Sequence, residues 1–416
     1  MRRRKAWLAA VLVLGVGVPA ILAAAAAPQA GGGDWPRYRG PKGDGISHET
    51  GLLKAWPASG PRILWRAKLG TGYSGMAVAN GRLFTLFGTG RDEFAIAFDA
   101  ASGKELWRAR LGPDRPDGQG GGPRATPTFD GGLVYALGAE GKLVALEAPT
   151  GKQRWAVDLV AQHGARVPDW GISTSPVVEG GLLLVDAGAG GGRSLLGLDK
   201  LTGKVVWAAE SDAPGYSTPL VVDLAGTRQA LFFAGTSLIS VSPRDGKRFW
   251  SVPWQTSYDV NAAMPVLVPP DKIFISSGYD TGGLLLKVVA KGGKPAVETL
   301  WRNRVMKNHF NSSVYAAGHL YGFDDSTLKC VDPASGEERW KQRGFGKGSL
   351  LAADGHLWVL SDRGELALVE LGPGGYREKA RTQVLQGKTW TMPTLAGKRL
   401  YLRSESELIA LDVAAG

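Results

Sequence analysis

The sequence contains almost no cysteine. Cys330 is the only one among 416 residues, so the chain cannot form an internal disulfide and its core alone must stabilise it. A single cysteine also excludes a haem-attaching C-x-x-C-H motif. Because Cys330 lies in an apolar stretch, we expect a buried and unreactive thiol.

Other chemical signatures are missing as well. There is no G-x-S-x-G nucleophile elbow. The formal net charge is +11, but no dense Lys/Arg stripe with interleaved aromatics supports nucleic-acid binding. A match to G-x-G-x-x-G at 70–75 precedes the alternating pattern of a strand, which argues against a dinucleotide site. The five histidines show no paired metal-ligand spacing: they are His48, His163, His309, His319 and His356.

The N-terminus has the pattern of an export signal. A basic start, "MRRRK", precedes an apolar run at 6–27 and small residues near Ala27 and Ala30 that suit cleavage. We therefore expect residues 1–30 to be a signal peptide or, alternatively, an uncleaved membrane anchor. No cysteine follows the run, so this is not a lipoprotein signal. We expect an exported protein of the periplasm or cell envelope, touching the membrane only through this segment if it is uncleaved.

Glycine and tryptophan are both abundant, at 60 and 14 residues, which favours short strands and tight turns. Several of the tryptophans belong to an internal repeat in which an acid is followed by Gly at +4 and Trp at +8. Ser242 replaces the acid once, and Trp301 follows a longer, degenerate linker. Full copies are Asp99–Gly103–Trp107, Glu147–Gly151–Trp155, Asp199–Gly203–Trp207 and Asp332–Gly336–Trp340.

Successive tryptophans of the repeat, from Trp65 to Trp340, are 39 to 52 residues apart, a range typical of four-stranded propeller blades. The carboxylate of the acid should accept hydrogen bonds from backbone N–H groups of the turn, the Gly should adopt a left-handed conformation, and the Trp should pack between blades. After Trp340 the Trp position is predicted at Val384. The last unit ends at Asp412, before its outer strand, and Trp65 begins an outer strand without a blade. Pairing the two predicts a closed, all-β, eight-bladed propeller.

These units resemble PQQ (pyrroloquinoline quinone) repeats, found in a propeller family that includes quinoprotein alcohol dehydrogenases and the outer-membrane assembly protein BamB. The resemblance covers about residues 60–416 and is specific for the fold, but the family mixes enzymes with cofactor-free scaffolds. Residues 31–59 are similar to an extension that precedes the propeller in exported members. We expect this extension to be strapped across one face; the alternative is a disordered tail.

Ligand sites in such propellers lie at a funnel on one face, in the loops that lead into each innermost strand and those between second and third strands. The first loops supply large polar or aromatic groups: Tyr73, Arg124, Trp170, Tyr216, Asn261, His309, Asn311, Lys347 and Lys388. The second loops supply Asp186, Asp280, Asp324, Asp325, Asp362 and Arg403.

The resemblance implies a role for several of these residues if a cofactor is bound. Arg124, Lys347 and Lys388 would pair with the carboxylates of PQQ, and Trp170 would stack on it. The remaining cofactor-binding candidates are Asn261 and His309. Asn261 with Asp324 or Asp325 would supply oxygens to Ca²⁺, and Asp325 would be the general base of a dehydrogenase.

The alternative is that these polar groups bond one another and water in a solvated channel. A single cysteine precludes the vicinal Cys-Cys pair of many PQQ alcohol dehydrogenases. The sequence therefore favours a binding or scaffold protein, with a PQQ- and Ca-dependent alcohol or sugar dehydrogenase as the competing hypothesis. Its expected partner is an envelope protein or a small anionic ligand at the funnel face, bound by a monomer.

Overall fold

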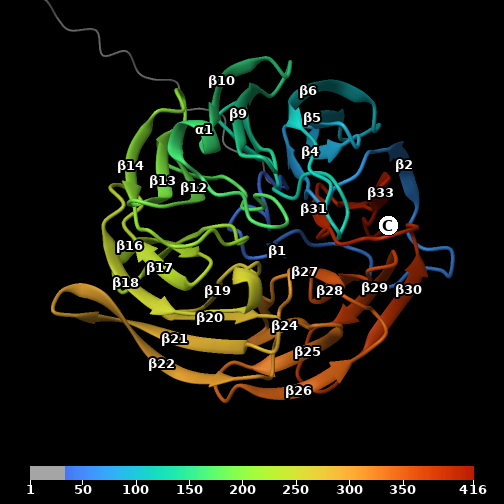
Figure 1. Cartoon of the computed structure of the whole chain (residues 1–416). Helices are drawn as coiled ribbons and strands as arrows, with labels where there is room; N and C mark the ends of the chain where they lie inside the picture. The colour runs from blue at the N-terminus through green and yellow to red at the C-terminus, as the bar shows by residue number, and fades with distance from the viewer. Residues whose placement is uncertain (1–32) are drawn as a thin grey trace, which may run out of the picture.

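Eight four-stranded antiparallel sheets surround a central axis in the computed structural model, which describes residues 33–416 (Figure 1). The eight-bladed, all-β fold expected from the repeat is confirmed. The expected signal or anchor at residues 1–30 lies outside the described residues. Within the described chain, no helix is both long and apolar enough to cross a membrane.

The first four blades follow chain order from the innermost strand outward. Blade 1 contains β3 (Ala77–Ala79), β4 (Arg82–Gly88), β5 (Asp92–Asp99) and β6 (Glu105–Pro113). Blade 2 contains β7 (Thr128–Asp130), β8 (Leu133–Leu137), β9 (Lys142–Glu147) and β10 (Gln153–Asp158), followed by helix α1 (Leu159–His163). Blade 3 contains β11 (Val177–Glu179), β12 (Leu182–Ala189), β13 (Arg193–Asp199) and β14 (Val205–Ala209). Blade 4 contains β15 (Leu220–Leu224), β16 (Thr227–Phe233), β17 (Ser237–Val241) and β18 (Arg248–Pro253).

The other four blades complete the ring. Blade 5 contains β19 (Val266–Val268), β20 (Lys272–Ser277), β21 (Gly282–Lys291) and β22 (Lys294–Asn303). Blade 6 contains β23 (Val314–Ala316), β24 (His319–Asp324), β25 (Thr327–Asp332) and β26 (Glu337–Gln342). Blade 7 contains β27 (Ser349–Ala353), β28 (His356–Leu360), β29 (Glu365–Glu370) and β30 (Glu378–Gln383), with β1 (Ile46–Ser47) added parallel to β27. Blade 8 contains β31 (Thr394–Ala396), β32 (Arg399–Arg403), β33 (Glu407–Asp412) and β2 (Ile63–Lys68).

The ring closes between the two ends of the chain. Strand β2 pairs antiparallel with β33, and Trp65 lies opposite Ala410; Figure 1 shows this blue strand beside the red one. Arg62 adds an ion pair of 2.6 Å to Asp412. Blade 8 is therefore built from both ends, as the orphan outer strand predicted, and neither end leaves a long free edge.

Tryptophans of the repeat join each blade to the next. The Trp107 indole donates to the Ala148 carbonyl at 2.9 Å and lies 2.6 Å from where a Cβ of Gly151 would stand. Gly151 has φ +71°, so both the turn and the neighbouring ring require glycine. Equivalent indole bonds of 2.8–3.1 Å come from Trp65, Trp155, Trp207, Trp301 and Trp340.

Trp250 departs from this pattern, because its indole donates to the Gln229 side chain within its own blade. The following blade has no tight acid–Gly turn to receive it. Instead β21 and β22 form a long hairpin, which projects past β18 at the rim of the disc (Figure 1).

The prediction of Val384 as a Trp position is wrong. Ala380 pairs with Leu368, as Trp340 pairs with Cys330 in blade 6. The hairpin between β29 and β30 is two residues longer than that of blade 6, which puts the equivalent position at Ala380, whereas the prediction assumed a longer insertion.

Trp56, from the segment before β2, stacks on Trp358 with ring centroids 5.8 Å apart. Trp358 lies opposite Leu368 in β29, and Tyr321 holds the equivalent position in blade 6. There the Tyr321 ring packs on the docking Trp340, with ring centroids 5.9 Å apart. The segment before the propeller thus supplies the aromatic ring that Ala380 cannot.

The same segment crosses the channel from one side of the ring to the other, along the ends of innermost strands. Trp35 bridges to Val78 in blade 1, and β1 pairs with β27 in blade 7. Between them, the buried Arg39 guanidinium donates to the carbonyls of Ser312 and Ser313 at the start of blade 6. The segment therefore spans the axis and blocks one end of the channel.

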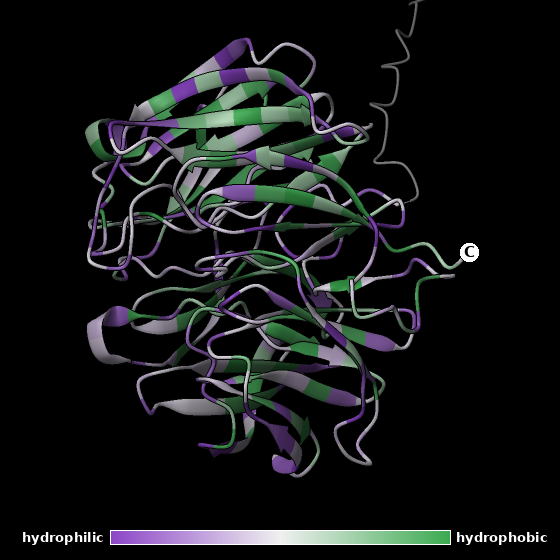
Figure 2. Ribbon diagram, turned by 90° about the vertical axis from the view of Figure 1, so that its right-hand side faces the viewer, coloured by the Kyte–Doolittle hydropathy of each residue, from purple (hydrophilic) through white to green (hydrophobic). Residues whose placement is uncertain are grey.

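A belt of hydrogen bonds explains the Ser/Thr-Pro pairs that precede many innermost strands. Thr126 accepts from Gly75 of blade 1, Ser175 accepts from Thr126, and Thr218 accepts from Ser175, at 2.9–3.0 Å. Each bond links one blade to the next around the axis. Apolar residues concentrate along the strands (Figure 2), and this polar belt fixes the loops above them.

Candidate functional site

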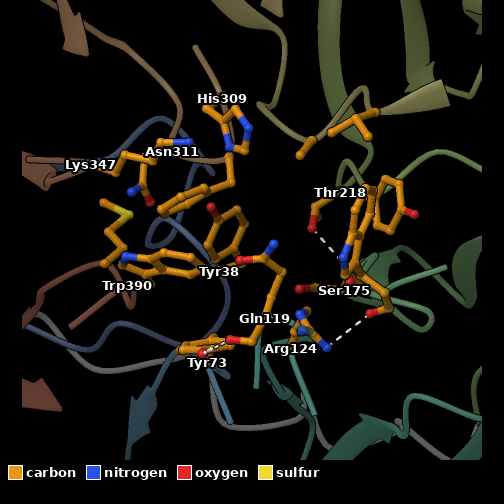
Figure 3. A pocket seen from close by; sticks show the side chains of 18 of the residues that line it. Tyr38, Tyr73, Gln119, Arg124, Ser175, Thr218, His309, Asn311, Lys347 and Trp390 are labelled. Atoms are coloured by element: carbon orange, nitrogen blue, oxygen red, sulfur yellow. Dashed lines mark hydrogen bonds between the residues drawn. The ribbon is translucent and has the colours of Figure 1, made fainter. Parts of the chain in front are cut away.

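A cavity of about 390 Å³ opens on the axis, within the range of small-molecule sites. Its wall is built by the loops that lead into the innermost strands, so all eight blades contribute to it. Tyr38 of the N-terminal segment lines the cavity from within the channel. Figure 3 shows Trp390 and Lys347 on one side of this space and Thr218 on the other.

Aromatic side chains encircle this cavity, and we call them the aromatic collar. Successive ring centroids lie 4.9–6.3 Å apart from Tyr73 to Trp170. Arg124 closes the circle, with its guanidinium 5.3 Å from the Tyr73 ring and a 2.9 Å bond to the Trp170 carbonyl. The collar consists of Tyr73, Trp390, Phe310, His309, Tyr279, Tyr258 and Trp170.

Three basic side chains expected at the funnel do converge there, and each already has an acidic partner. Arg124 is 2.8 Å from Asp117, and both side chains are largely buried, at 14% and 9% exposed. Lys347 is 3.4 Å from Asp325. The charge of these two cations is thus compensated behind the cavity wall.

Lys388 lies beside the collar, with its ammonium 4.4 Å from the centre of the Trp390 ring. It donates to the Gln119 carbonyl at 2.7 Å and is 3.8 Å from Glu405. Lys388 therefore holds the 114–124 loop over the cavity, and its charge too has a partner.

Asn261 does not face the cavity, contrary to expectation. It is fully buried; its amide nitrogen donates to the Ala234, Gly235 and Trp254 carbonyls, and its oxygen accepts from Ser277. These bonds turn the side chain away from the axis and tie the loop that leads into blade 5 to blade 4.

The acids expected to bind Ca²⁺ are engaged elsewhere. Asp324 pairs with Lys329 at 2.8 Å, and Asp325 is 56% exposed beside Lys347. With Asn261 buried in its loop, the three do not form a set of free oxygen ligands. Among the described residues, no group of three or more His, Cys, Asp or Glu side chains suits a metal ion.

The other loop residues have mainly structural contacts. Arg403 is buried and donates to the Ser74, Leu86 and Gly72 carbonyls. Asp186 accepts from the backbone of Gly188 and Gly215, and burial raises its pKa to about 7. Asp280 pairs with the exposed Arg304, and Asp362 accepts from the Lys347 backbone.

His309 is part of the collar. Burial, followed by the charge of Lys347, lowers the pKa of His309 to about 4. The imidazole is therefore neutral at neutral pH and acts as one more flat ring in the wall.

Sequence reasoning missed several residues of this site, namely Tyr38, Gln119, Tyr258, Tyr279, Phe310 and Trp390. Phe310 and Trp390 lie in the same loops as the predicted His309 and Lys388, two of the polar residues by which those loops were represented. Weighting aromatic residues in those loops would have found them. Tyr38 and Gln119 come from segments outside the repeat, which the repeat register does not place.

The side chains that line the cavity do not fit a Ca²⁺ ion bound together with PQQ. No carboxylate lines the cavity in the part of the chain that the structure describes, whereas Ca²⁺ requires several oxygen ligands, carboxylates among them. Asp325, the candidate base, lies outside the wall and pairs with Lys347. Aromatic planes to sandwich a flat ligand are present, so the disagreement concerns the metal and the base.

The fold and site together define an eight-bladed, tryptophan-docked propeller with an aromatic central cavity. The family model described as "Outer membrane protein assembly factor BamB" matches residues 49–116, 91–342 and 324–416. The chain belongs to this family of PQQ-repeat propellers.

Individual relatives are distant. The BamB protein of Burkholderia pseudomallei is 25% identical over 67% of this chain and 68% of its own length. The quinoprotein alcohol dehydrogenase PedH of Pseudomonas putida is 27% identical, over 36% of this chain and 25% of its own. The crystal structure of BamB from Moraxella catarrhalis superposes with a TM-score of 0.60 at 16% identity, covering 86% of this chain and 99% of that one.

Proposed function

We propose that this protein is an exported binding or scaffold module of the periplasm or cell envelope, and that its collar face is the binding surface. One observation carries the proposal: the chain's own segment blocks one end of the channel, and the other end opens into a wall of aromatic rings to which the described residues contribute no carboxylate. Such a cavity can hold a ligand, but residues 33–416 place neither a carboxylate base nor a metal-binding cluster in its wall.

Relatives support a non-enzymatic role. Assembly factors named BamB include the match that spans two thirds of both chains, and a protein partner in the envelope follows from that likeness. The export pattern at 1–30 agrees with this location.

A PQQ-dependent dehydrogenase is the competing function, because one relative is named a quinoprotein alcohol dehydrogenase. Purified protein would be mixed with PQQ and Ca²⁺, passed through gel filtration and assayed for dye reduction with alcohols. We expect no quinone absorbance in the protein fraction and no dye reduction. Retention of both would replace the binding proposal with the enzyme.

A direct test uses photo-crosslinking in intact cells. A crosslinking amino acid replaces Tyr258, which is 69% exposed on the collar, or Lys152, an exposed residue of an outer hairpin, as the control. We expect discrete adducts from position 258 only, in the periplasmic or envelope fraction. Equal adducts from both positions, or a protein confined to the cytoplasm, would contradict the proposal.

A further inference from the structure

We infer that the aromatic collar binds an uncharged saccharide ring, preferably one with equatorial hydroxyls. The inference rests on the proposed binding function and specifies its ligand. It follows from where the aromatic rings stand, from the charge of the cavity and from the polar groups left free in it.

Aromatic faces stand on opposite sides of the cavity. Trp390 belongs to blade 8 and packs on Phe310 at 4.9 Å. Tyr216 belongs to blade 4, half a turn away in an eight-bladed ring, and packs on Trp170 at 5.8 Å. A ligand on the axis thus meets aromatic surface on two sides. A pyranose with equatorial hydroxyls presents C–H bonds on both faces, and these stack on aromatic rings.

The charge of the cavity favours a neutral ligand. Arg124 and Lys347 line the wall, but Asp117 and Asp325 compensate them at 2.8 and 3.4 Å. An anion would gain only by breaking these pairs. A cation would face the two basic groups without any lining carboxylate. An uncharged polyhydroxyl compound meets neither obstacle, and the N–H groups of both side chains can still donate to its oxygens.

Two side-chain amides are positioned for hydroxyl groups. Asn311 donates its amide N–H to the Gly348 carbonyl at 2.8 Å, which fixes the side chain and leaves its oxygen for a donor. Gln119 reaches into the centre of the cavity in Figure 3, and its amide has no hydrogen-bond partner within residues 33–416. Hydroxyl groups both donate and accept, so a sugar can use both amides.

The size of the cavity favours a sugar over a docked peptide. A volume of about 390 Å³ enclosed by eight loops suits a small compact unit, whereas peptide grooves are open at both ends so that the chain can continue. The blocked channel behind Tyr38 provides no second opening.

Calorimetric titration of the mature protein tests the inference. The probes are the β1,4-linked dimers of glucose and of N-acetylglucosamine, which suit a cavity of about 390 Å³, with the corresponding mannose dimer as the axial-hydroxyl comparison. We expect saturable binding of at least one of the first two and weaker binding of the third. Trp390→Ala should weaken binding about tenfold, the value of one aromatic contact, and Trp390→Phe should retain most of it.

Controls keep the outcome clear. Leu201→Ala changes an exposed residue of an outer hairpin and should leave binding unchanged. If Trp390→Ala fails to fold, Gln119→Ala alters only an exposed loop side chain and should still weaken binding. No saturable binding of any of the three dimers up to millimolar concentrations would overturn the inference, as would binding of a proline decamer or of PQQ instead. Adducts from position 258 would persist in that case, so the binding function itself would stand.

Discussion

Buried carboxyl groups connect neighbouring blades. Glu93 in β5 is almost fully buried, and one of its oxygens accepts from the Ala139 backbone of blade 2 at 2.9 Å. Burial raises the pKa of Glu93 to about 7. The folded state therefore holds this proton over a pH range in which the unfolded chain releases it, and ionisation costs stability.

Glu93→Gln should remove this pH dependence. The pKa of Glu93 is higher in the folded protein than in the unfolded chain. The stability that protonated Glu93 contributes to the wild type is therefore lost as pH rises from about 4.5 to about 7. Above pH 7 the variant should be more stable than the wild type by about 1–3 kcal/mol, because one pKa unit corresponds to about 1.4 kcal/mol. Urea unfolding at a series of pH values measures this.

The adjacent Asp92 provides a control of opposite sign. Its hydrogen bond to Arg110 lowers the pKa of Asp92, so its contribution is present near neutrality and disappears as pH falls. Asp92→Asn should lose stability at neutral pH and match the wild type in acid. A Glu93→Gln profile parallel to the wild type would show that Glu93 is ionised throughout.

Arg124 and Lys347 should differ in how much each contributes to the stability of the fold. Arg124→Ala removes a largely buried guanidinium and leaves Asp117 unpaired, so we expect a loss of about 2–4 kcal/mol. Lys347→Ala removes one partner of an exposed pair and should change stability by less than about 0.5 kcal/mol. Thermal unfolding of the two variants measures the contrast, and equal melting temperatures would show that Arg124 is free for a ligand.

The register of the repeat predicts which residue positions lie near the axis, but it does not predict which of their side chains point toward it. Arg124, Trp170, His309 and Lys347 were placed correctly at the cavity. Asn261 occupies an equivalent position, yet backbone carbonyls that no sequence pattern displays turn its side chain away. Side-chain direction depends on such partners, and they come from other parts of the chain.

At the scale of elements, the acid–Gly–Trp hairpin was predictable because it is local. The acid, the left-handed Gly and the Trp all lie within nine residues, and the Asp199 carboxylate accepts from the backbone of its own turn as expected. The register failed where the hairpin length changed, at Val384. Similarly, nothing near Ala380 indicates that Trp56, far away in sequence, covers Trp358.

Trp56→Ala should test whether the N-terminal segment supports blade 7. Trp56 is half-buried and stacks on Trp358, so we expect a loss of about 2–3 kcal/mol, somewhat below the 3–5 typical of a fully buried tryptophan. The docking residue Trp65, 8% exposed, is the comparison and should reach that upper range when changed to Ala. Chemical denaturation gives both values. An unchanged midpoint for Trp56→Ala would mean that the stacking of Trp56 on Trp358 does not stabilise blade 7.

At the scale of the whole molecule, stability depends on a contact between the two ends of the described chain. Strand β2 precedes blade 1 and β33 ends blade 8, so their pairing holds all eight blades in one ring. A break there would expose two sheet edges at once. Apart from the contacts of the N-terminal segment, the remaining interfaces join neighbouring blades of the ring. The β2–β33 pairing therefore spans nearly the whole propeller, from Ile63 to Leu411, and its formation requires closure of a very long loop.

An engineered disulfide can measure that closure. Lys68 and Glu407 are paired across β2 and β33, and Cys330 is buried, so it should not compete. A Lys68→Cys/Glu407→Cys variant closes a loop of nearly the whole propeller. A Lys272→Cys/Lys287→Cys variant, paired within blade 5, closes a short one. Chain-entropy reasoning predicts that the oxidised first variant gains about 2–3 kcal/mol more than the second, with both gains lost on reduction. Equal gains would mean that the unfolded chain keeps its ends close together, and a gain confined to blade 5 would place the weakest contact of the ring elsewhere.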